Sequence, residues 1–313
     1  MMNKKSNNIL LILFIVLAVG CAPAKFTIPV LPDTQVAVTD RHDMFYAQLN
    51  WIAKAKDSLN IPIALHVGDL VNFDTIPQFE RASMGYEALD KVGLPYAIAI
   101  GNHDTEAVLP DNGSAAPGNV NANLRKTFKF NKYFPVRRFA LQKGRYEPGK
   151  SDNSYQVFKA GGKKYLVVVL EFCAREGAAQ WMDKIIKEHP KHKVIVLTHY
   201  HLTPKGDIAT SNAGYGDMKV VDVFNQYRKP HKNVMMVLSG HVCYSNHRID
   251  VGTQGNKIYQ VLSNYQCKDA GGGYIRLLEF DKKRKTISAK MYSPYYDKEL
   301  NDDSKFIFDN VKF

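Results

Sequence analysis

The chain has 313 residues, with 42 Lys and Arg against 30 Asp and Glu, so its formal net charge is +12. Hydrophobic residues make up 45% and charged residues 23%, which excludes a disordered chain, and four cysteines are too few for a disulfide scaffold. A chain of this length buries a large core without a metal to stabilise it, so a bound metal would serve chemistry. The positive charge favours anionic partners such as phosphate esters, nucleic acid or acidic membrane surfaces.

The first twenty residues have the pattern of a bacterial lipoprotein signal. Lys4 and Lys5 precede an apolar run over 9–20 that is too short for a stable membrane span. Small residues before Cys21 resemble a lipobox, in which Cys21 becomes the lipidated first residue. We therefore expect residues 1–20 to be a signal peptide and residues 21–313 one domain, anchored outside the cytoplasm to a cell-envelope membrane. An ordinary signal peptide or an uncleaved anchor is the alternative.

Strand-like and helix-like segments alternate in the first hundred residues. Strands are predicted over 26–31, 61–67 and 96–100, and helices over 43–59 and 75–93. Thr75 with Gln78 three residues later forms a capping-box pattern at the start of the second helix. This βαβαβ beginning predicts an α/β fold with strands buried between helices.

Residues 105–153 show little periodicity, which predicts a long functional loop. Strands follow over 155–159, 165–172, 194–198 and 234–238, with three more within 257–292, and helices lie around Trp181 and over 218–227. Neither a repeat nor an interdomain linker is evident, so one domain is the simplest interpretation. The segment 124–138 mixes basic and aromatic residues, which could bind nucleic acid, but we favour a cover that selects substrate together with 201–217.

Polar residues follow five of the predicted strands directly. In α/β folds such strand ends converge on one crevice, where sites are built. Carboxylate, amide and imidazole groups are ligands for Zn, Mn or Fe. The sequence therefore predicts a metal site from Asp33, Asp69, Asn102, His199 and His241, beside His103 and Asp104.

These ordered blocks resemble the calcineurin-like metallophosphoesterase superfamily, in a bacterial subgroup whose first motif is D-T-Q. The most specific block is G-N-H-D over 101–104. The resemblance implies a four-layer α/β/β/α sandwich and two divalent metal ions (Mn, Zn or Fe). It also implies hydrolysis of a small anionic phosphomono- or phosphodiester by a metal-bound hydroxide.

The resemblance also implies a role for each matching residue. Asp69 would bridge two metals, Asp33 would bind the first, and the second would be held by Asn102, His199 and His241. His103 would not be a ligand; it would donate a hydrogen bond or a proton to the leaving oxygen. Asp104 would orient the His103 ring.

Two positions depart from the family pattern, and both fall on the first metal. Gln35 stands where the family has His, and its oxygen is a weaker candidate ligand. Cys243 stands at the second His of G-H-x-H, and it is a substitute ligand, a non-ligand, or a disulfide partner of Cys267. The nearby His247 is a less favoured replacement ligand.

Other residues allow more than one interpretation. Cys173 is expected to be a small buried hydrophobe. Gln266 and Arg276 are either near the substrate or, as we favour, an ordinary strand end and a surface arginine. Because of the substitutions at Gln35 and Cys243, a non-catalytic metal- or phosphate-binding protein on the same scaffold is the alternative function. An extracellular nuclease is a further alternative.

Overall fold

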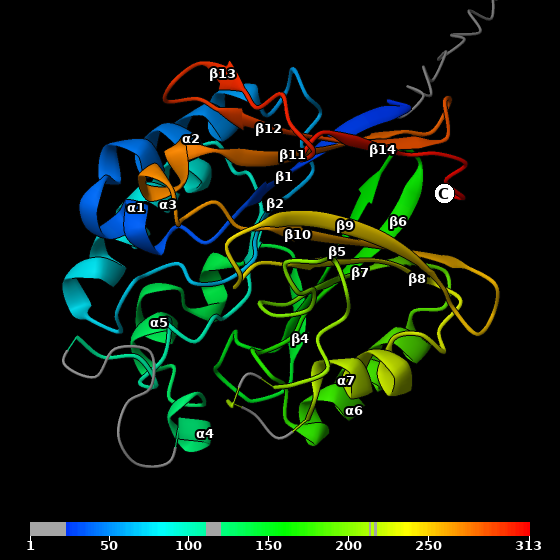
Figure 1. Cartoon of the computed structure of the whole chain (residues 1–313), viewed down its shortest axis with the longest axis horizontal. Coiled ribbons are helices and arrows are strands. Elements are labelled where there is room, and N and C mark those ends of the chain that lie inside the picture. The colour runs from blue at the N-terminus through cyan, green and yellow to red at the C-terminus, as the bar shows by residue number, and fades with distance from the viewer. Residues whose placement is uncertain (1–22, 111–119, 213, 216–217) are drawn as a thin grey trace, which may run out of the picture.

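The structure is a computed structural model that describes residues 23–110, 120–212, 214–215 and 218–313. The predicted signal peptide and Cys21 lie outside the described residues. Two seven-stranded sheets pack face to face, and helices cover their outer faces (Figure 1). This is the predicted four-layer α/β/β/α sandwich. In the part of the chain so described, no helix has the length and apolar character needed to cross a bilayer.

The first sheet has the order β13-β12-β11-β1-β2-β3, with β14 paired to β12. Strands β1, β2 and β3 are parallel, whereas β11 runs antiparallel to β1. The bounds are β1 Lys25–Leu31, β2 Ala64–His66, β3 Tyr96–Ile98, β11 Ile275–Asp281, β12 Thr286–Ser293, β13 Lys298–Glu299 and β14 Phe306–Phe308.

The second sheet has the order β4-β5-β6-β7-β8-β10-β9. Its central strands β6, β7, β8 and β10 are parallel, and nearly all their residues are buried because both faces are covered. The bounds are β4 Gln142–Arg145, β5 Ser154–Ala160, β6 Lys163–Val169, β7 Lys193–Leu197, β8 Val234–Ser239, β9 Ser245–Val251 and β10 Lys257–Ser263.

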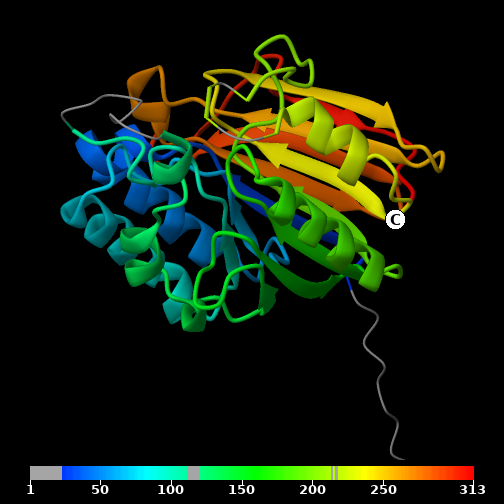
Figure 2. The same cartoon turned by 90° about the horizontal axis from the view of Figure 1, so that it is seen from below.

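Three hydrophobic cores join the four layers. One lies between the sheets and includes Ile28, Val167 and Leu278. The other two lie outside the sheets: α2 and α3 cover the first sheet, and α6 and α7 cover the second (Figure 2). The helices are α1 Gln35–Asp40, α2 His42–Ala55, α3 Ile76–Lys91, α4 Val120–Asn123, α5 Phe128–Tyr133, α6 Glu176–Glu188 and α7 Val220–Tyr227.

Three sequence predictions need correction. The first long helix ends at Ala55, not at residue 59. The capping box is not formed: Thr75 makes no side-chain cap bond, and Gln78 Oε1 instead accepts the N–H groups of Asn72 and Phe73. The segment 105–153 is not an unstructured loop, since it contains α4, α5 and β4. This segment also buries Phe130 in the core, and its weak periodicity gave no indication of that burial.

Candidate metal centre

The site lies where strands of both sheets end. Asp33 follows β1, Asp69 follows β2, His199 follows β7 and His241 follows β8. Ligand atoms of Asp69, His199 and His241 lie within 4.8 Å of one another. The parallel strand ends therefore bring together acids and imidazoles that are up to 208 residues apart in the chain.

Asp69 and His199 form the buried centre of this group. His199 Nε2 lies 3.0 Å from Asp69 Oδ2, and its Nδ1 donates to the Val67 carbonyl at 2.9 Å. Burial opposes ionisation of both groups, but their mutual attraction is stronger. It lowers the pKa of Asp69 and raises the pKa of His199 to about 9. Since a carbonyl accepts only, Nδ1 carries a hydrogen, and Nε2 is the atom that faces the site.

His241 links this pair to Asp33. Its Nδ1 lies 3.2 Å from His199 Nε2, and its backbone N–H donates to Asp33 Oδ2 at 2.8 Å. Asn264 Nδ2 donates to the same oxygen at 2.6 Å. Burial raises the pKa of Asp33, and burial together with the neighbouring His199 lowers the pKa of His241 to about 3. The second imidazole is therefore neutral, with a lone pair available to a ligand.

Two observations show that these residues fit a cation. Buried Asp33 Oδ1 and Asn102 Oδ1 have no hydrogen-bond partner, which is costly for polar atoms removed from water. In addition, a Cβ at Gly101 would lie 2.1 Å from Asp69 Oδ1, and one at Gly240 would lie 2.0 Å from Asp33 Oδ1. Glycine at these two positions therefore leaves room for both carboxylates beside the imidazoles.

The structure corrects the role expected of Asp104. His103 Nδ1 contacts the Asn72 carbonyl at 2.7 Å, so a backbone oxygen orients the ring. Asp104 is fully buried and accepts the N–H groups of Gly101 and Val71 at 2.9 and 3.0 Å. Burial and the nearby Asp69 raise its pKa to about 7. Both Asp104 oxygens therefore hold backbone N–H groups around the site, and the His103 ring is bonded to the Asn72 carbonyl instead.

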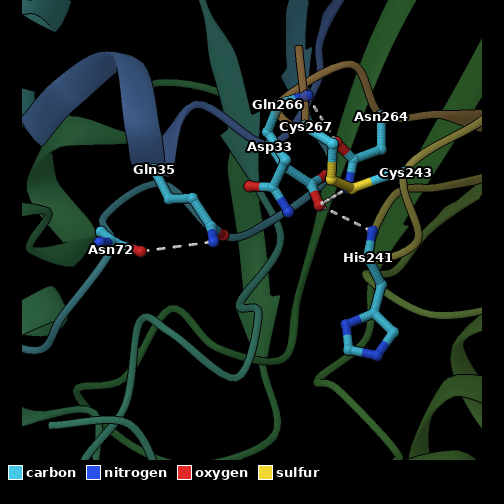
Figure 3. The surroundings of a disulfide bond; sticks show 8 residues. All are labelled: Asp33, Gln35, Asn72, His241, Cys243, Asn264, Gln266 and Cys267. Carbon is cyan, nitrogen blue, oxygen red and sulfur yellow. Dashed lines mark hydrogen bonds between the residues drawn. A yellow bond between two sulfur atoms is a disulfide. The ribbon is translucent and has the colours of Figure 1, made fainter. Parts of the chain in front are cut away.

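The structure also decides among the alternatives for Cys243. Cys243 and Cys267 form a disulfide, with Cα atoms 5.8 Å apart (Figure 3). A disulfide sulfur has no thiolate to offer, so the prediction of Cys243 as a metal ligand is wrong. Gln35 lies at the start of α1 and is buried; its Nε2 donates to Asn72 Oδ1 at 3.5 Å, and its Oε1 has no partner. That oxygen remains a candidate ligand.

Several residues of the site were missed in the sequence. Asn264 follows β10 as the predicted ligands follow their strands, so the same strand-end rule would have found it. Asn72 is three residues beyond Asp69 and offers no such signal, because it acts through its carbonyl. Phe172 packs at a tilted angle against the rings of His199 and His241, with centroids 5.4 and 5.0 Å away, and forms an apolar wall.

Three further polar or cysteine residues considered in the sequence are buried. Arg276 is buried, not on the surface, and donates to Ser263 and Ser304. His201 is buried between Gln260 and Arg228. Cys173 is buried, as expected.

The basic segment 124–138 gives little support to nucleic-acid binding. Four of its six basic residues pair with carboxylates: Arg125 with Glu171, Lys126 with Glu106, Lys129 with Asp74 and Arg138 with Asp90.

Comparisons with known proteins identify the family. The sequence model of the calcineurin-like phosphoesterase family matches residues 34–245, which is more than half of the chain. The chain belongs to the calcineurin-like phosphoesterase family. Members of this family are hydrolases that act on phosphate esters, and they generally hold two metals.

Other proteins share sequence or fold with the chain. The chain is 30% identical over 297 residues to the uncharacterized protein YvnB of Bacillus subtilis, covering 91% of this chain. It spans only 21% of that protein's length. The purple acid phosphatase PPD1 of yellow lupin has the same fold at 15% identity and a TM-score of 0.54, over 91% of this chain and 54% of that one. A dimetal phosphatase of Danio rerio aligns at 11% identity with the same TM-score, over 88% and 98%.

Proposed function

We propose that this calcineurin-like phosphoesterase hydrolyses a small phosphomono- or phosphodiester with the help of divalent cations. The observation that carries the proposal is the convergence of Asp69, His199 and His241 within 4.8 Å, beside buried oxygens that lack donors. Bound cations would supply charge neutralisation of the ester and acidification of water, which this reaction requires. The positive net charge of the chain favours an anionic substrate.

The protein's own residues divide the remaining work. His199 would hold a cation through Nε2, since its Nδ1 donates to Val67, and the Nε2 proton that its raised pKa retains would leave when the cation binds. Asn102 would contribute its unpartnered Oδ1. Asp69 would hold the cations through its carboxylate, and its Oδ1 also accepts the backbone N–H of His103 at 3.0 Å. The same carboxylate would therefore bind a cation, and it fixes the backbone of His103, which carries the proton donor.

His103 is the proton donor in this proposal. Its Nδ1 hydrogen is committed to the Asn72 carbonyl, so Nε2 is the atom that gives a proton to the leaving oxygen. Its ring is partly exposed, as is that of His241, whereas His199 is fully buried. Exposure allows His103 to meet substrate and to regain a proton from water, and a positioned imidazole adds roughly 10²–10⁴-fold to such a reaction.

The test is turnover of p-nitrophenyl phosphate and bis-p-nitrophenyl phosphate by the purified protein with added Mn, Zn or Fe. We expect hydrolysis of at least one ester, lost in Asp69→Asn and retained in Asp57→Asn, whose carboxylate is exposed. No turnover with any metal would refute the proposal. Metal binding without turnover would favour a non-catalytic binding protein.

We also propose that Cys21 is lipidated and anchors the protein outside the cytoplasm. The disulfide supports this location, because disulfides persist in oxidising compartments. The experiment is mass spectrometry of the mature N-terminus after expression of the full chain in a bacterial host. An acylated Cys21 is expected, and a chain that begins elsewhere without lipid would contradict the proposal.

A further inference from the structure

A second group of oxygen atoms lies beside the histidine-containing group. Asp33 is 2% exposed, and its Oδ2 accepts the N–H of His241 and the amide of Asn264. Its other oxygen, Oδ1, is buried and has no partner. The protein therefore holds this carboxylate through one oxygen and leaves the other oxygen available to a cation.

Two glutamine oxygens are left without partners in the same way. Gln35 is 5% exposed, and its amide nitrogen is directed to Asn72, which leaves Oε1 buried and unpaired. Gln266 Oε1 is likewise buried without a partner, although its backbone N–H is fixed by Asn264 Oδ1 at 3.0 Å. Figure 3 shows both glutamine side chains extending toward Asp33 from separate segments of the chain.

Nitrogen and sulfur donors are excluded from this second group. Cys243 is bonded to Cys267. His247, four residues after Cys243, stacks on Phe306 with ring centroids 3.8 Å apart and also packs against Phe308. That ring is committed to an aromatic cluster, so it does not replace the missing histidine.

We propose that Asp33, Gln35 and Gln266 form an oxygen-only position for a hard divalent cation such as Mn²⁺ or Mg²⁺. The neighbouring position, with His199 and His241, suits borderline ions such as Zn²⁺ or Fe²⁺, because imidazole prefers them whereas carboxylate and carbonyl oxygens prefer Mn²⁺ and Mg²⁺. The proposal rests on the proposed metal-dependent function and adds that the two positions take different metals. Apart from Asp69, which the two positions would share, the oxygen-only position has one carboxylate and two neutral amides, and the lack of an imidazole makes it the weaker of the two.

Metal titration of the full chain, stripped with a chelator, tests this inference without an activity assay. The protein is brought to one equivalent of Zn²⁺ and then titrated with Mn²⁺, with bound Mn²⁺ followed by electron paramagnetic resonance. We expect about one further equivalent of Mn²⁺ to bind. Gln266→Leu should weaken Mn²⁺ binding by at least about tenfold and leave Zn²⁺ unchanged.

Gln266→Glu distinguishes ligation from structural support. An added carboxylate should tighten Mn²⁺ binding by about tenfold or more, whereas a residue that only supports the loop would show no gain. Gln180→Leu, on the exposed face of α6, is the matched control and should behave as the wild type. Equal Mn²⁺ affinity in wild type, Gln266→Leu and Gln266→Glu would overturn this inference alone. Failure of the wild type to bind either metal would overturn both it and the proposed function.

Discussion

The Cys243–Cys267 disulfide joins the loop that carries His241 to the loop after β10, and its removal has a calculable cost. The two cysteines are 24 residues apart in the chain. In the chain-entropy model, opening a loop of this length in Cys243→Ser/Cys267→Ser lowers the free energy of unfolding by about 3.5 kcal/mol at 25 °C. For a domain of this size, that corresponds to a fall in melting temperature of about 6 °C.

The disulfide has a local effect as well. Cys243 lies two residues after His241, and Cys267 lies three residues after Asn264. Both of those residues donate to Asp33 Oδ2. Because the disulfide fixes the two segments against each other, the double variant should also bind Mn²⁺ more weakly than the wild type.

The assay is thermal unfolding in chelator, followed by circular dichroism, with and without a phosphine reductant. Chelation matters because a bound ion stabilises the folded state by mass action. Reductant should lower the melting temperature of the wild type toward that of the double variant, and should leave the double variant unchanged. Cys173→Ala keeps the disulfide and should respond to reductant as the wild type does. If the double variant melts together with the oxidised wild type, the reasoning is refuted.

Three further predictions follow from the structure: two concern the packing around the site, and one concerns a buried acid elsewhere. Gly101→Ala should abolish metal binding, because its Cβ would lie 2.1 Å from Asp69 Oδ1 and 2.4 Å from the Asp69 backbone nitrogen; an unchanged Mn²⁺ titration would contradict this. Gln78→Leu frees the loop that orients His103, so kcat should fall while metal affinity is retained, and Gln78→Glu should restore kcat. Burial raises the pKa of Asp152 from 3.8 to about 6, so the folded state alone holds a proton between these values and stability falls as pH rises through them. Asp152→Asn should therefore have the same free energy of unfolding as the wild type near pH 4. At pH 8 its free energy of unfolding, measured by denaturant titration, should exceed that of the wild type by up to about 3 kcal/mol. Equal stability of the two proteins at both pH values would count against the argument.

Much of the fold followed from patterns that depend on local burial. Strands β1, β7 and β8 lie within one or two residues of their predicted bounds, because continuous apolar runs mark strands that are covered on both faces. Strand β9, Ser245–Val251, was missed since its residues are mostly half-exposed and polar. It lies at the edge of its sheet, where pairing with β10 rather than hydrophobic burial defines the strand.

The candidate site was predictable where side chains supply the donors. Asp69, His199 and His241 were found because each follows a parallel strand, and such strand ends share one edge of the fold. Backbone donors and acceptors leave no such record in the sequence. The carbonyl of Asn72 orients His103, and this role could not be inferred from the identity of residue 72. Asp104 was therefore predicted to orient the ring, whereas it accepts backbone N–H groups.

Backbone strain gathers at the same place as the unsatisfied oxygens. Asp69 and His241 have φ values of 51° and 74°, in a left-handed region that costs a non-glycine residue roughly 1–2 kcal/mol. Asp33, close by, keeps an orphaned oxygen in a buried environment. A fold that places strain, a desolvated carboxylate and a buried ion pair at one set of strand ends sacrifices stability there. Cation binding would compensate that loss, so the metal centre should gain more stability from Mn²⁺ than any other part of the chain described here.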